Sequence, residues 1–256
     1  MNNWLRFVSW FNRKAKNFAI RLVKWTGKSK EYVHPKHLIY DEDHYWFAPH
    51  LASDDVVLDM GAGAGAHALV AAERAARVVA LEGSPKHVES ARRLQQEREL
   101  KNLVFKTADL EKPIDEPSDF FTAVLALDIL EHLHSRDQLL RETNRVLRKG
   151  GRLFLSVPNR DTSWKRRLAM HGLFYYSDLD HKYEYASDEI QKITRDYGFE
   201  ILKLDPTVYD TPWVGLIDVV GGLSLSLYGK LSRWKRDKAI MNPREATGFR
   251  IVARKL

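Results

Sequence analysis

The chain has 256 residues, 44% of them hydrophobic and 29% charged, which is enough apolar material for one α/β domain with extensions. It contains no cysteine, and this excludes a disulfide framework, a thiolate metal site and a cysteine nucleophile. The formal net charge is +7, but residues 1–36 hold nine of the 41 Lys and Arg residues and only one of the 34 acidic residues. The basic charge therefore lies in an N-terminal segment, a pattern that favours a membrane surface or a nucleic acid as partner.

Residues 4–25 are predicted to form an amphipathic helix. Apolar side chains recur at steps of three and four and so share one face: Trp4, Val8, Phe11, Ala15, Phe18, Leu22 and Trp25. Basic residues occupy the rest of the helix, as in a helix that lies in a membrane interface. The alternatives are a helix packed on its own domain or on a homodimer partner, and an organellar targeting segment. Arg6, Arg13 and Lys14 interrupt the apolar run that a secretory signal would need.

Residues 32–50 are rich in histidine and aromatic residues. This stretch is either a lid over a ligand pocket or a linker whose rings pack on the core. We expect the rings to pack, with Tyr45 or Trp46 also in reach of a ligand.

A buried strand at 55–59 opens the α/β part of the chain and ends in Asp59. Glycines follow at alternate positions, at Gly61, Gly63 and Gly65, before a helix at 66–76. Glycine allows a tight turn and lets a ligand approach main-chain N–H groups that a Cβ would shield. A strand, a glycine loop and a helix form the ligand-binding corner of a doubly wound α/β domain. Such a corner suits a dinucleotide, a nucleoside or a simple tight turn.

The next two strands are each followed by a carboxylate. Residues 77–81 form the second strand and lead to Glu82, which lies 21 positions after Gly61. A βαβ unit holds at this place the acidic residue that accepts hydrogen bonds from ribose hydroxyls. A helix at 85–99 and a third strand at 103–106 follow. Asp109, near the end of that strand, could accept a hydrogen bond from an adenine amine.

The fourth strand, at 120–127, leads into a segment with three potential catalytic or metal-binding side chains. Asp128, Glu131 and His132 are three and four positions apart and would share one face of a helical turn. Two carboxylates and an imidazole could bind a divalent cation, and a histidine could also deprotonate a hydroxyl nucleophile. The alternative is a loop without a metal. A helix at 137–148 and a fifth strand at 152–157 follow.

Two long connections come after the fifth strand. Residues 160–188 are aromatic and basic, and they include His181 as a candidate base or fourth metal ligand. Loops at the carboxyl ends of strands carry substrate specificity in α/β folds. A helix at 187–197 and a strand at 199–204 follow, and residues 206–246 then lead to the last strand, at 248–253.

Residues 213–229, inside the second connection, carry a single charged residue. They are too few to span a membrane. They are predicted to form a hydrophobic cap, a shallowly inserted segment or a helical hairpin that covers the N-terminal helix.

Taken in order, these motifs resemble a class I S-adenosylmethionine-dependent methyltransferase. The resemblance rests on the segments VLDMGAGAG at 57–65, VVALEGS at 78–84, TADL at 107–110, LALDILEHL at 125–133 and LRKGGRLFLSVPN at 147–159. It implies a doubly wound α/β fold, with a seven-stranded Rossmann-like sheet whose last strand is antiparallel. The implied domains are an N-terminal helix and aromatic linker at 1–50 and a methyltransferase domain at 51–256, with a substrate loop at 160–188 and a helical insertion at 206–246.

The resemblance also implies roles for individual residues in binding S-adenosylmethionine. Carried over position by position, the set is Asp59, Gly61 and Gly63 at the methionine end, Glu82, Gly83 and Ser84 at the ribose, Asp109 and Leu110 at the adenine, and Leu127 near the ribose and the sulfonium.

The segment from Asp128 to His132 resembles the Glu-x-x-Glu-His segment of ubiquinone-pathway O-methyltransferases and small-RNA 2′-O-methyltransferases. That segment holds a divalent cation such as Mg²⁺, and here Asp128 replaces its first glutamate. The expected metal ligands are therefore Asp128, Glu131 and His132. The expected catalytic residues are His132, Asp128 and His181.

The expected function is O-methylation of an amphiphilic or lipid-linked small molecule, such as a sugar, a quinone or an isoprenoid. We expect a cytoplasmic protein that binds peripherally to an anionic membrane surface. The DPPY- or NPPY-type signature of amino-group methyltransferases that act on bases or glutamine is absent, and Val157-Pro158-Asn159 stands after the fifth strand instead, which favours an oxygen or carbon nucleophile. A second hypothesis is a soluble small-molecule or sugar methyltransferase whose appendages form a lid and a homodimer contact. A third is RNA methylation through the basic N-terminal segment, although no RNA-binding module is recognisable.

Overall fold

The computed structural model describes residues 2–30, 32–39 and 44–256. Contacts divide the chain into two compact units. The sheet unit comprises residues 45–158, 177–205 and 249–256, and the helical unit comprises residues 1–44, 159–176 and 206–248. The helical unit thus combines the N-terminal segment with the predicted insertion and the first part of the predicted substrate loop. Residues 1–50 do not form a unit of their own.

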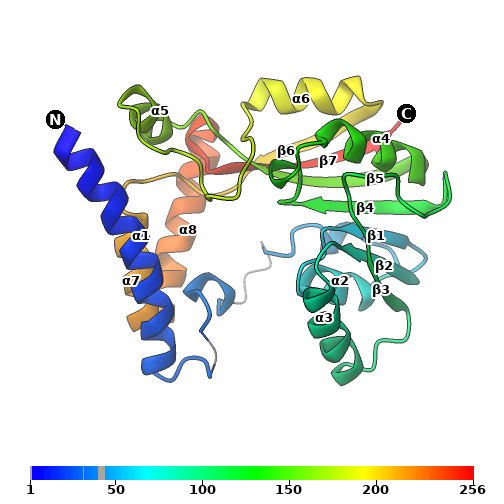
Figure 1. Ribbon diagram of the computed structural model, residues 1–256, viewed down its shortest axis with the longest axis horizontal. Helices are drawn as coiled ribbons and strands as arrows, with labels where there is room; N and C mark the ends of the chain where they lie inside the picture. Colours follow the sequence, from blue (N-terminus) through cyan, green and yellow to red (C-terminus); the bar gives the residue numbers. More distant parts are fainter. Residues whose placement is uncertain (1, 31, 40–43) are drawn as a thin grey trace. The chain divides into compact units, whose positions relative to one another are not determined.

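A seven-stranded sheet in the order β3-β2-β1-β4-β5-β7-β6 forms the centre of the sheet unit (Figure 1). The strands are β1 (Val56–Met60), β2 (Arg77–Glu82), β3 (Leu103–Thr107), β4 (Phe121–Leu127), β5 (Leu147–Pro158), β6 (Phe199–Pro206) and β7 (Gly248–Lys255). The first five pair in parallel. Leu256 N–H donates to Gly198 O, and Thr207 N–H donates to Gly248 O, so β6 and β7 run in opposite directions. The predicted α/β fold with an antiparallel last strand is confirmed.

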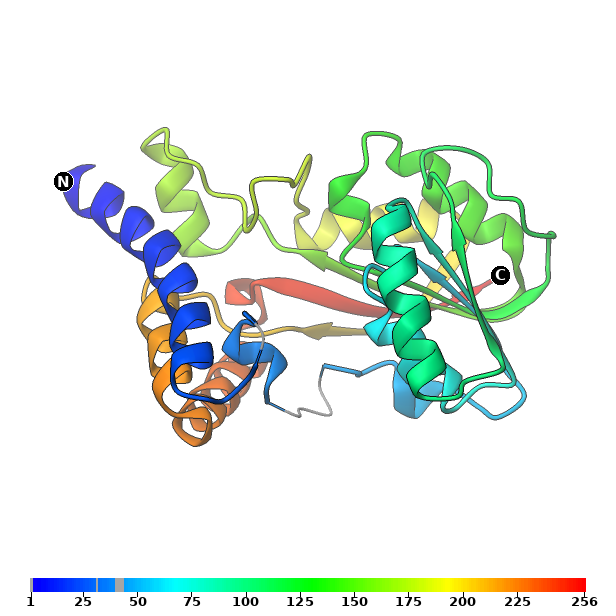
Figure 2. The ribbon, with the colours of Figure 1, turned by 60° about the horizontal axis from the view of Figure 1, so that its bottom comes forward.

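Helices cover both faces of this sheet (Figures 1 and 2). On one face lie α2 (Ala66–Ala72) and α3 (Pro85–Glu97), and on the other lie α4 (Arg136–Val146) and α6 (Ser187–Asp196). Each face has its own apolar core. All seven residues of β4 are buried, as expected for a continuous apolar strand that is covered on both sides. The fold is therefore doubly wound, and the carboxyl ends of its parallel strands meet at one edge.

The strand order reverses between β1 and β4, because β2 and β3 extend the sheet on one side and β5 on the other. Open α/β sheets bind ligands in the crevice at such a switch point, outside the carboxyl ends of the strands. The loops after β1 and β4 flank this position. They hold residues 61–65 and the short helix η3 (Leu130–His132).

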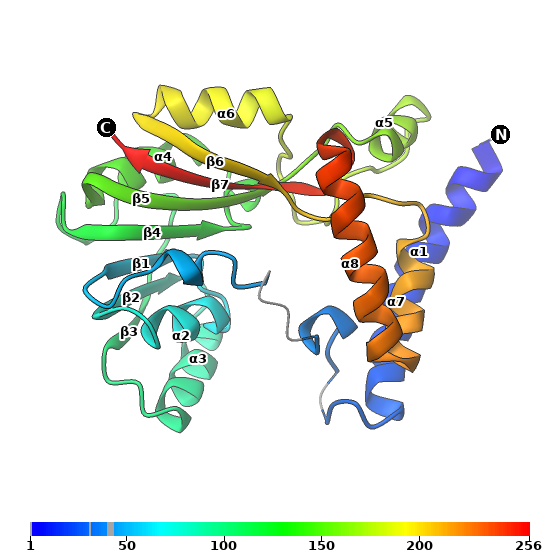
Figure 3. The same cartoon turned by 180° about the vertical axis from the view of Figure 1, so that it is seen from behind.

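The helical unit consists of α1 (Asn2–Trp25), α5 (Ser163–Met170), α7 (Val214–Leu223) and α8 (Leu225–Met241), with the short helices η1 (Pro35–His37) and η4 (Pro243–Glu245). Helices α1 and α7 lie side by side (Figure 3). Their backbones approach closely: a Cβ on Gly222 would lie 2.6 Å from the Cβ of Leu22. The helical insertion predicted before the last strand is confirmed, and α7 within it packs on the N-terminal helix, which is one of the three arrangements predicted for residues 213–229.

The face of α1 that packs overlaps the predicted one only in part, because Val8, Ala15 and Leu22 of the predicted face do pack. Its buried apolar side chains are Leu5, Val8, Ala15, Ala19 and Val23, whereas Trp4, Phe18 and Trp25 of the predicted face stay exposed. The close approach of α7 explains the difference, because only small or slender side chains fit between the two backbones. Among the helices of residues 2–30, 32–39 and 44–256, none is both long enough and apolar enough to cross a membrane.

Candidate functional site

Three glycines shape the loop between β1 and α2. Gly61, Gly63 and Gly65 have φ angles of 83°, 54° and 87°, which favour glycine. A Cβ on Gly61 would lie 2.7 Å from Cδ1 of Ile129, and one on Gly65 would lie 2.8 Å from the ring of Phe105. A Cβ on Gly63 would meet no atom of the described residues within 4 Å. The outer glycines are therefore required by packing, whereas the backbone at Gly63 faces free space that a ligand could fill.

The Glu82 carboxylate ties this loop to the start of α3. The Gly63 N–H donates to Oε2 of Glu82 at 2.9 Å, and the Ser84 N–H donates to Oε1 at 2.9 Å. Ser84 is the N-cap of α3, and its side chain accepts a hydrogen bond from the backbone of His87. Glu82, the residue expected to bind a ribose, therefore lies directly against the glycine loop. This is the place that its spacing of 21 residues from Gly61 predicts.

Asp59, at the end of β1, is a buried acid with unused bonding capacity. Its side chain is 1% exposed, and Oδ2 has no hydrogen-bond partner among the described residues. Burial, followed by the nearby charge of Glu82, raises the pKa of Asp59 to about 7, against a hydrogen bond from the Ala68 backbone. A buried carboxylate oxygen without a donor is costly, and a cationic or N–H group beside it would remove that cost.

The residues expected around an adenine, Asp109 and Leu110, follow β3. Glu82 is paired in register with Thr107, which brings Asp109 and Leu110 to the same edge of the sheet. Asp109 is exposed and closes its own turn: it accepts the Glu111 N–H at 3.0 Å and pairs with Lys112 at 3.1 Å, and these contacts lower its pKa.

Three further members of the expected cofactor set differ in exposure and surroundings. Leu110 and Leu127 are buried. A Cβ on Gly83 would lie 3.7 Å from the carbonyl oxygen of Ala108, an ordinary contact. No close packing therefore requires glycine at position 83.

Asp128 is bound to the neighbouring strand instead of joining Glu131 and His132. Its φ angle is 52°, an unusual value for a residue with a side chain. Its N–H donates to Oγ of Ser156 at 3.0 Å, and that hydroxyl donates to Oδ1 of Asp128 at 2.7 Å. The left-handed conformation prevents a regular helix from starting at this point. The predicted helical face shared by Asp128, Glu131 and His132 is therefore not formed.

A different group of side chains comes together here: Glu131, His132 and His181. Each has a potential ligand atom, and these atoms lie within 4.8 Å of one another. The two imidazole rings meet edge to face with centroids 4.8 Å apart. The Lys182 N–H donates to Glu131 O at 2.7 Å, which holds the loop that carries His181 against η3. The loop thus brings His181 beside His132, as expected for a base or a further metal ligand.

The surroundings of His132 favour its neutral form. Burial, followed by the nearby His181, lowers its pKa, while Asp178, Asp180 and Asp128 act in the opposite direction. A neutral imidazole has a lone pair that can accept a proton or bind a metal.

Glu184 is a member of this site that sequence reasoning missed. It is completely buried, and its Oε1 lies 2.8 Å from Nδ1 of His181 and also accepts the Ser177 N–H. This contact sets the orientation of the His181 ring and leaves Nε2 for other partners. The signal in the sequence was an acid three positions after a candidate histidine, a spacing that brings side chains together in a turn.

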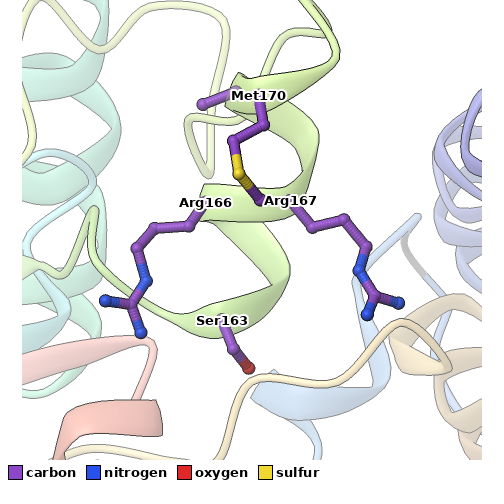
Figure 4. A pocket seen from close by; sticks show the side chains of 5 residues that line it. Ser163, Arg166, Arg167 and Met170 are labelled. Carbon is purple, nitrogen blue, oxygen red and sulfur yellow. The ribbon is translucent and has the colours of Figure 1, made fainter.

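A surface pocket of about 570 Å³ in the helical unit is lined by α5 alone (Figure 4). Arg166 and Arg167 point away from each other around it. Lys165 is buried, and its Nζ donates to Asn159 O at 2.7 Å. The basic run at 165–167 therefore does not converge on one anion.

Residues 58–155 match a protein family described as a methyltransferase domain. The ubiquinone biosynthesis O-methyltransferase of Xanthomonas oryzae pv. oryzae (strain PXO99A) is 32% identical over 123 residues, which are 48% of this chain and 51% of that protein. The sarcosine/dimethylglycine N-methyltransferase of Halorhodospira halochloris is 32% identical over 109 residues, 42% of this chain and 39% of that protein. The chain thus spans about half the length of the first relative and less of the second.

The fold agrees with this similarity. The crystal structure of an S-adenosylmethionine-dependent methyltransferase from Methanosarcina mazei matches with a TM-score of 0.59 at 18% identity. The match covers 85% of this chain and 98% of that one.

Proposed function

The chain carries a methyltransferase domain in residues 58–155, on the fold of the S-adenosylmethionine-dependent methyltransferases, and from this premise we propose that it methylates an oxygen of an amphiphilic or lipid-linked small molecule at a membrane surface. One observation carries the cofactor part of the proposal. The open backbone of Gly63, the Glu82 carboxylate on its N–H and the unpaired oxygen of buried Asp59 lie at the carboxyl ends of β1 and β2.

These residues fit S-adenosylmethionine by charge and shape. The cofactor supplies, when bound, a methyl group activated by a positively charged sulfur, and it also has a ribose diol and an ammonium group. Glu82 would accept the ribose hydroxyls, and Asp59 would lie beside the cationic methionine end. Gly63 leaves room along the loop beside the tightly packed Gly61, Gly83 and Asp109 would border the adenosine, and Leu110 and Leu127 would supply apolar walls. Positioning of this kind lowers the activation free energy of a transfer between two bound groups by roughly 7–11 kcal/mol.

The histidine pair supports an oxygen acceptor. A hydroxyl must lose its proton as it becomes a nucleophile, and a neutral His132 can take that proton. His181, oriented by Glu184, lies beside it and would line the place of the acceptor hydroxyl. The relative named as a ubiquinone biosynthesis enzyme is also an O-methyltransferase.

A finer proposal is that Glu131, His132 and His181 hold a divalent cation that polarises the acceptor oxygen. One carboxylate and two imidazoles suit a transition metal such as Zn²⁺ better than Mg²⁺, which prefers oxygen ligands. Glu184 on Nδ1 of His181 would then be the outer partner that such ligands require. Elemental analysis after dialysis against Zn²⁺ or Mg²⁺ tests this directly. We expect one bound Zn²⁺ that His181→Ala loses, and a chain without metal under both conditions would contradict the proposal.

The cofactor site is tested by a matched pair of glycine variants. Gly63→Val places a branched side chain in the free space of the loop, and we expect affinity for S-adenosylhomocysteine to fall by about 100-fold or more. Gly150→Val is the control, because Gly150 also has a positive φ and free space around it but lies at the start of β5. Calorimetry that finds equal affinity in both variants would refute the assignment of the loop.

The acceptor is identified by metabolite profiling of a deletion strain. We expect an amphiphilic species that lacks one methyl group on oxygen to accumulate. Accumulation of an amine instead, the acceptor class of the relative named as an N-methyltransferase, would overturn the oxygen assignment.

A further inference from the structure

The helical unit exposes large apolar side chains on two of its helices. On α1, Phe7, Phe18 and Trp25 are 58%, 45% and 66% exposed, and on α7, Leu216 and Leu223 are 49% and 59% exposed. Exposed apolar residues are common singly, but a contiguous set marks an interaction site. These residues form a contiguous set if those on α1 and those on α7 lie on the same side of the helix pair.

The glycines of α7 establish how the two helices face each other. A Cβ on Gly215 would lie 2.8 Å from Cα of Asn12 and 2.9 Å from the Cβ of Ala15. A Cβ on Gly222, two turns later, would lie against Leu22 and Ala19 O. Because the later residues of α7 meet the later residues of α1, the helices run in the same direction. The contact stripe of α7 therefore includes Gly215 and Gly222, and that of α1 includes Asn12, Ala15, Ala19 and Leu22.

Helical geometry then gives the side on which each exposed set lies. With 3.6 residues per turn, Phe7, Phe18 and Trp25 are rotated by about 100° from the contact stripe of α1. Leu216 and Leu223 are rotated by about 100° from the contact stripe of α7, in the opposite sense. In parallel helices that face each other, opposite rotations lead to the same side. The five residues therefore form one surface, which we call the apolar side.

The other side of the pair is covered by the chain itself. A Cβ on Gly221 would lie 2.7 Å from both Pro35 and the ring of Tyr228. Tyr228 also donates to Asp218 at 3.2 Å, and His34 approaches the same carboxylate at 3.2 Å. The Asp218 carboxylate and its two partners thus lie on the covered side, and the five exposed apolar residues lie on the opposite side.

Charge distinguishes the possible occupants of the apolar side. Residues 2–25 include six basic residues and no acidic one. Lys14 and Arg21, seven positions apart, border the aromatic stripe of α1 by the same helical geometry. Two copies of this surface would bring like charges together, which opposes self-association. An anionic lipid surface offers the opposite charge, and each basic residue near it contributes about 1 kcal/mol.

We propose that the apolar side of α1 and α7 is the docking surface for an anionic lipid bilayer. The helices lie flat in the interface, with Phe7, Phe18, Trp25, Leu216 and Leu223 among the lipid headgroups and Lys14 and Arg21 beside the phosphates. This inference deepens the proposed function, because it rests on an amphiphilic acceptor and names the surface through which the protein reaches it. It also assigns α7 an equal part, which an isolated amphipathic α1 would not require.

Vesicle co-sedimentation of the full chain tests the surface. The probes are vesicles of phosphatidylcholine mixed with phosphatidylglycerol and vesicles of phosphatidylcholine alone. We expect Leu216→Glu combined with Leu223→Glu to weaken binding to the mixed vesicles by about tenfold or more, and Phe18→Glu combined with Trp25→Glu to do the same. Leu94→Glu is the control, because Leu94 is an exposed leucine on α3 in the sheet unit. We expect this variant to bind like the unaltered protein.

A charge variant separates the electrostatic contribution. Lys14→Gln combined with Arg21→Gln should weaken binding to the mixed vesicles and make it less sensitive to salt, with little effect on the neutral vesicles. Unaltered binding in the α7 variant would overturn the proposal. The proposal would also be overturned if the unaltered protein does not bind vesicles but forms dimers that Leu216→Glu dissociates. The occupant of the apolar side would then be a second copy of the chain.

Affinity for S-adenosylhomocysteine, measured on every variant, reports folding and separates the two proposals. Normal cofactor affinity without vesicle binding overturns the docking surface and leaves methyl transfer intact. Vesicle binding by an unaltered protein that fails to bind the cofactor overturns methyl transfer and leaves the docking surface intact.

Discussion

At the residue scale, two neighbouring carboxylates have opposite surroundings. Glu82 accepts two main-chain N–H groups and is held in one place. Asp59 is buried, has an unpaired oxygen and lies near the charge of Glu82. Burial and this charge raise the pKa of Asp59 to about 7. The pair therefore offers one fixed acceptor for hydroxyl groups and one acid that ionises near neutral pH. A cationic ligand would favour the ionised form of Asp59.

The raised pKa of Asp59 predicts a pH-dependent cofactor affinity. A cation beside this carboxyl lowers its pKa, so affinity for S-adenosylmethionine should rise as pH increases from about 6 to about 8. Binding near pH 7 should release up to one proton. Calorimetry in buffers of different ionisation enthalpy measures that release. Asp59→Asn should abolish it, and equal proton release in this variant would contradict the assignment.

The same shift predicts how the unliganded protein responds to pH. The folded state holds the Asp59 proton more tightly than the unfolded chain, whose value is 3.8, so this group favours folding at low pH. Its contribution should be lost as pH rises toward about 7. Urea unfolding at several pH values should show a smaller decline between these limits in Asp59→Asn than in the unaltered protein.

Glu184 is expected to act through His181 as a positioning residue. Glu184→Gln keeps the shape but removes the charge beside Nδ1, so we expect kcat to fall by about 10–100-fold with little change in cofactor affinity. Steady-state kinetics measures kcat, and calorimetry with S-adenosylhomocysteine measures the cofactor affinity. Glu200→Gln, which breaks an exposed ion pair with Arg254, is the control and should leave both values unchanged.

At the scale of the elements, two features are unusual: the irregular turn after β4 and the close packing of α1 and α7. The chain leaves β4 through Asp128 in a left-handed conformation, and η3 is a single short turn. This turn places Ile129 over Gly61 and exposes His132 to the loop that carries His181. The helix pair depends on Gly215 and Gly222, which let α7 approach α1. In both places the backbone decides which side chains meet.

The helix pair predicts opposite effects for two glycine-to-alanine changes. A methyl group on Gly222 would overlap Leu22 and approach Ala19 O to 3.0 Å, so Gly222→Ala should destabilise the protein by roughly 1–3 kcal/mol. A methyl group on Gly229 of α8 would have its nearest neighbour 4.0 Å away. Gly229→Ala should therefore stabilise by about 1 kcal/mol through helix propensity. Urea denaturation measures both, and the same sign for both would contradict this account.

At the scale of the whole molecule, the two proposed activities belong to different units. The loop after β1, Glu82, Asp59 and the histidine pair all lie in the sheet unit, whereas the apolar side lies in the helical unit. The helical unit is assembled from three separate stretches of the chain, each inserted before or between parts of the sheet. A chain organised in this way can vary its docking surface without altering the residues that would bind the cofactor.

This division predicts where ligands slow hydrogen exchange. S-adenosylhomocysteine should protect amides in residues 61–65 and at the start of α3, because its expected partners lie there. Anionic vesicles should protect α1 and α7 instead. Hydrogen exchange followed by mass spectrometry resolves the two regions. Protection of α1 by S-adenosylhomocysteine as strong as that of the glycine loop would contradict the division.

The sequence by itself determined the sheet, the glycine loop and the place of Glu82, because these depend on local patterns. Apolar runs, glycines at alternate positions and an acid at fixed spacing act within one βαβ unit. Tertiary structure alone decided that Asp128 leaves the group around His132, that Glu184 joins His181, and which residues of α1 stay exposed. Asp128 was lost from the cluster to a bond with Ser156 on a neighbouring strand, and His181 entered it from a loop some fifty residues later. Trp4, Phe18 and Trp25 of the predicted face stay exposed because α7, through two glycines, packs on the stripe of α1 that includes Ala15, Ala19 and Leu22. Contacts between segments far apart in sequence leave no periodic signal in either segment, and only packing selects among them.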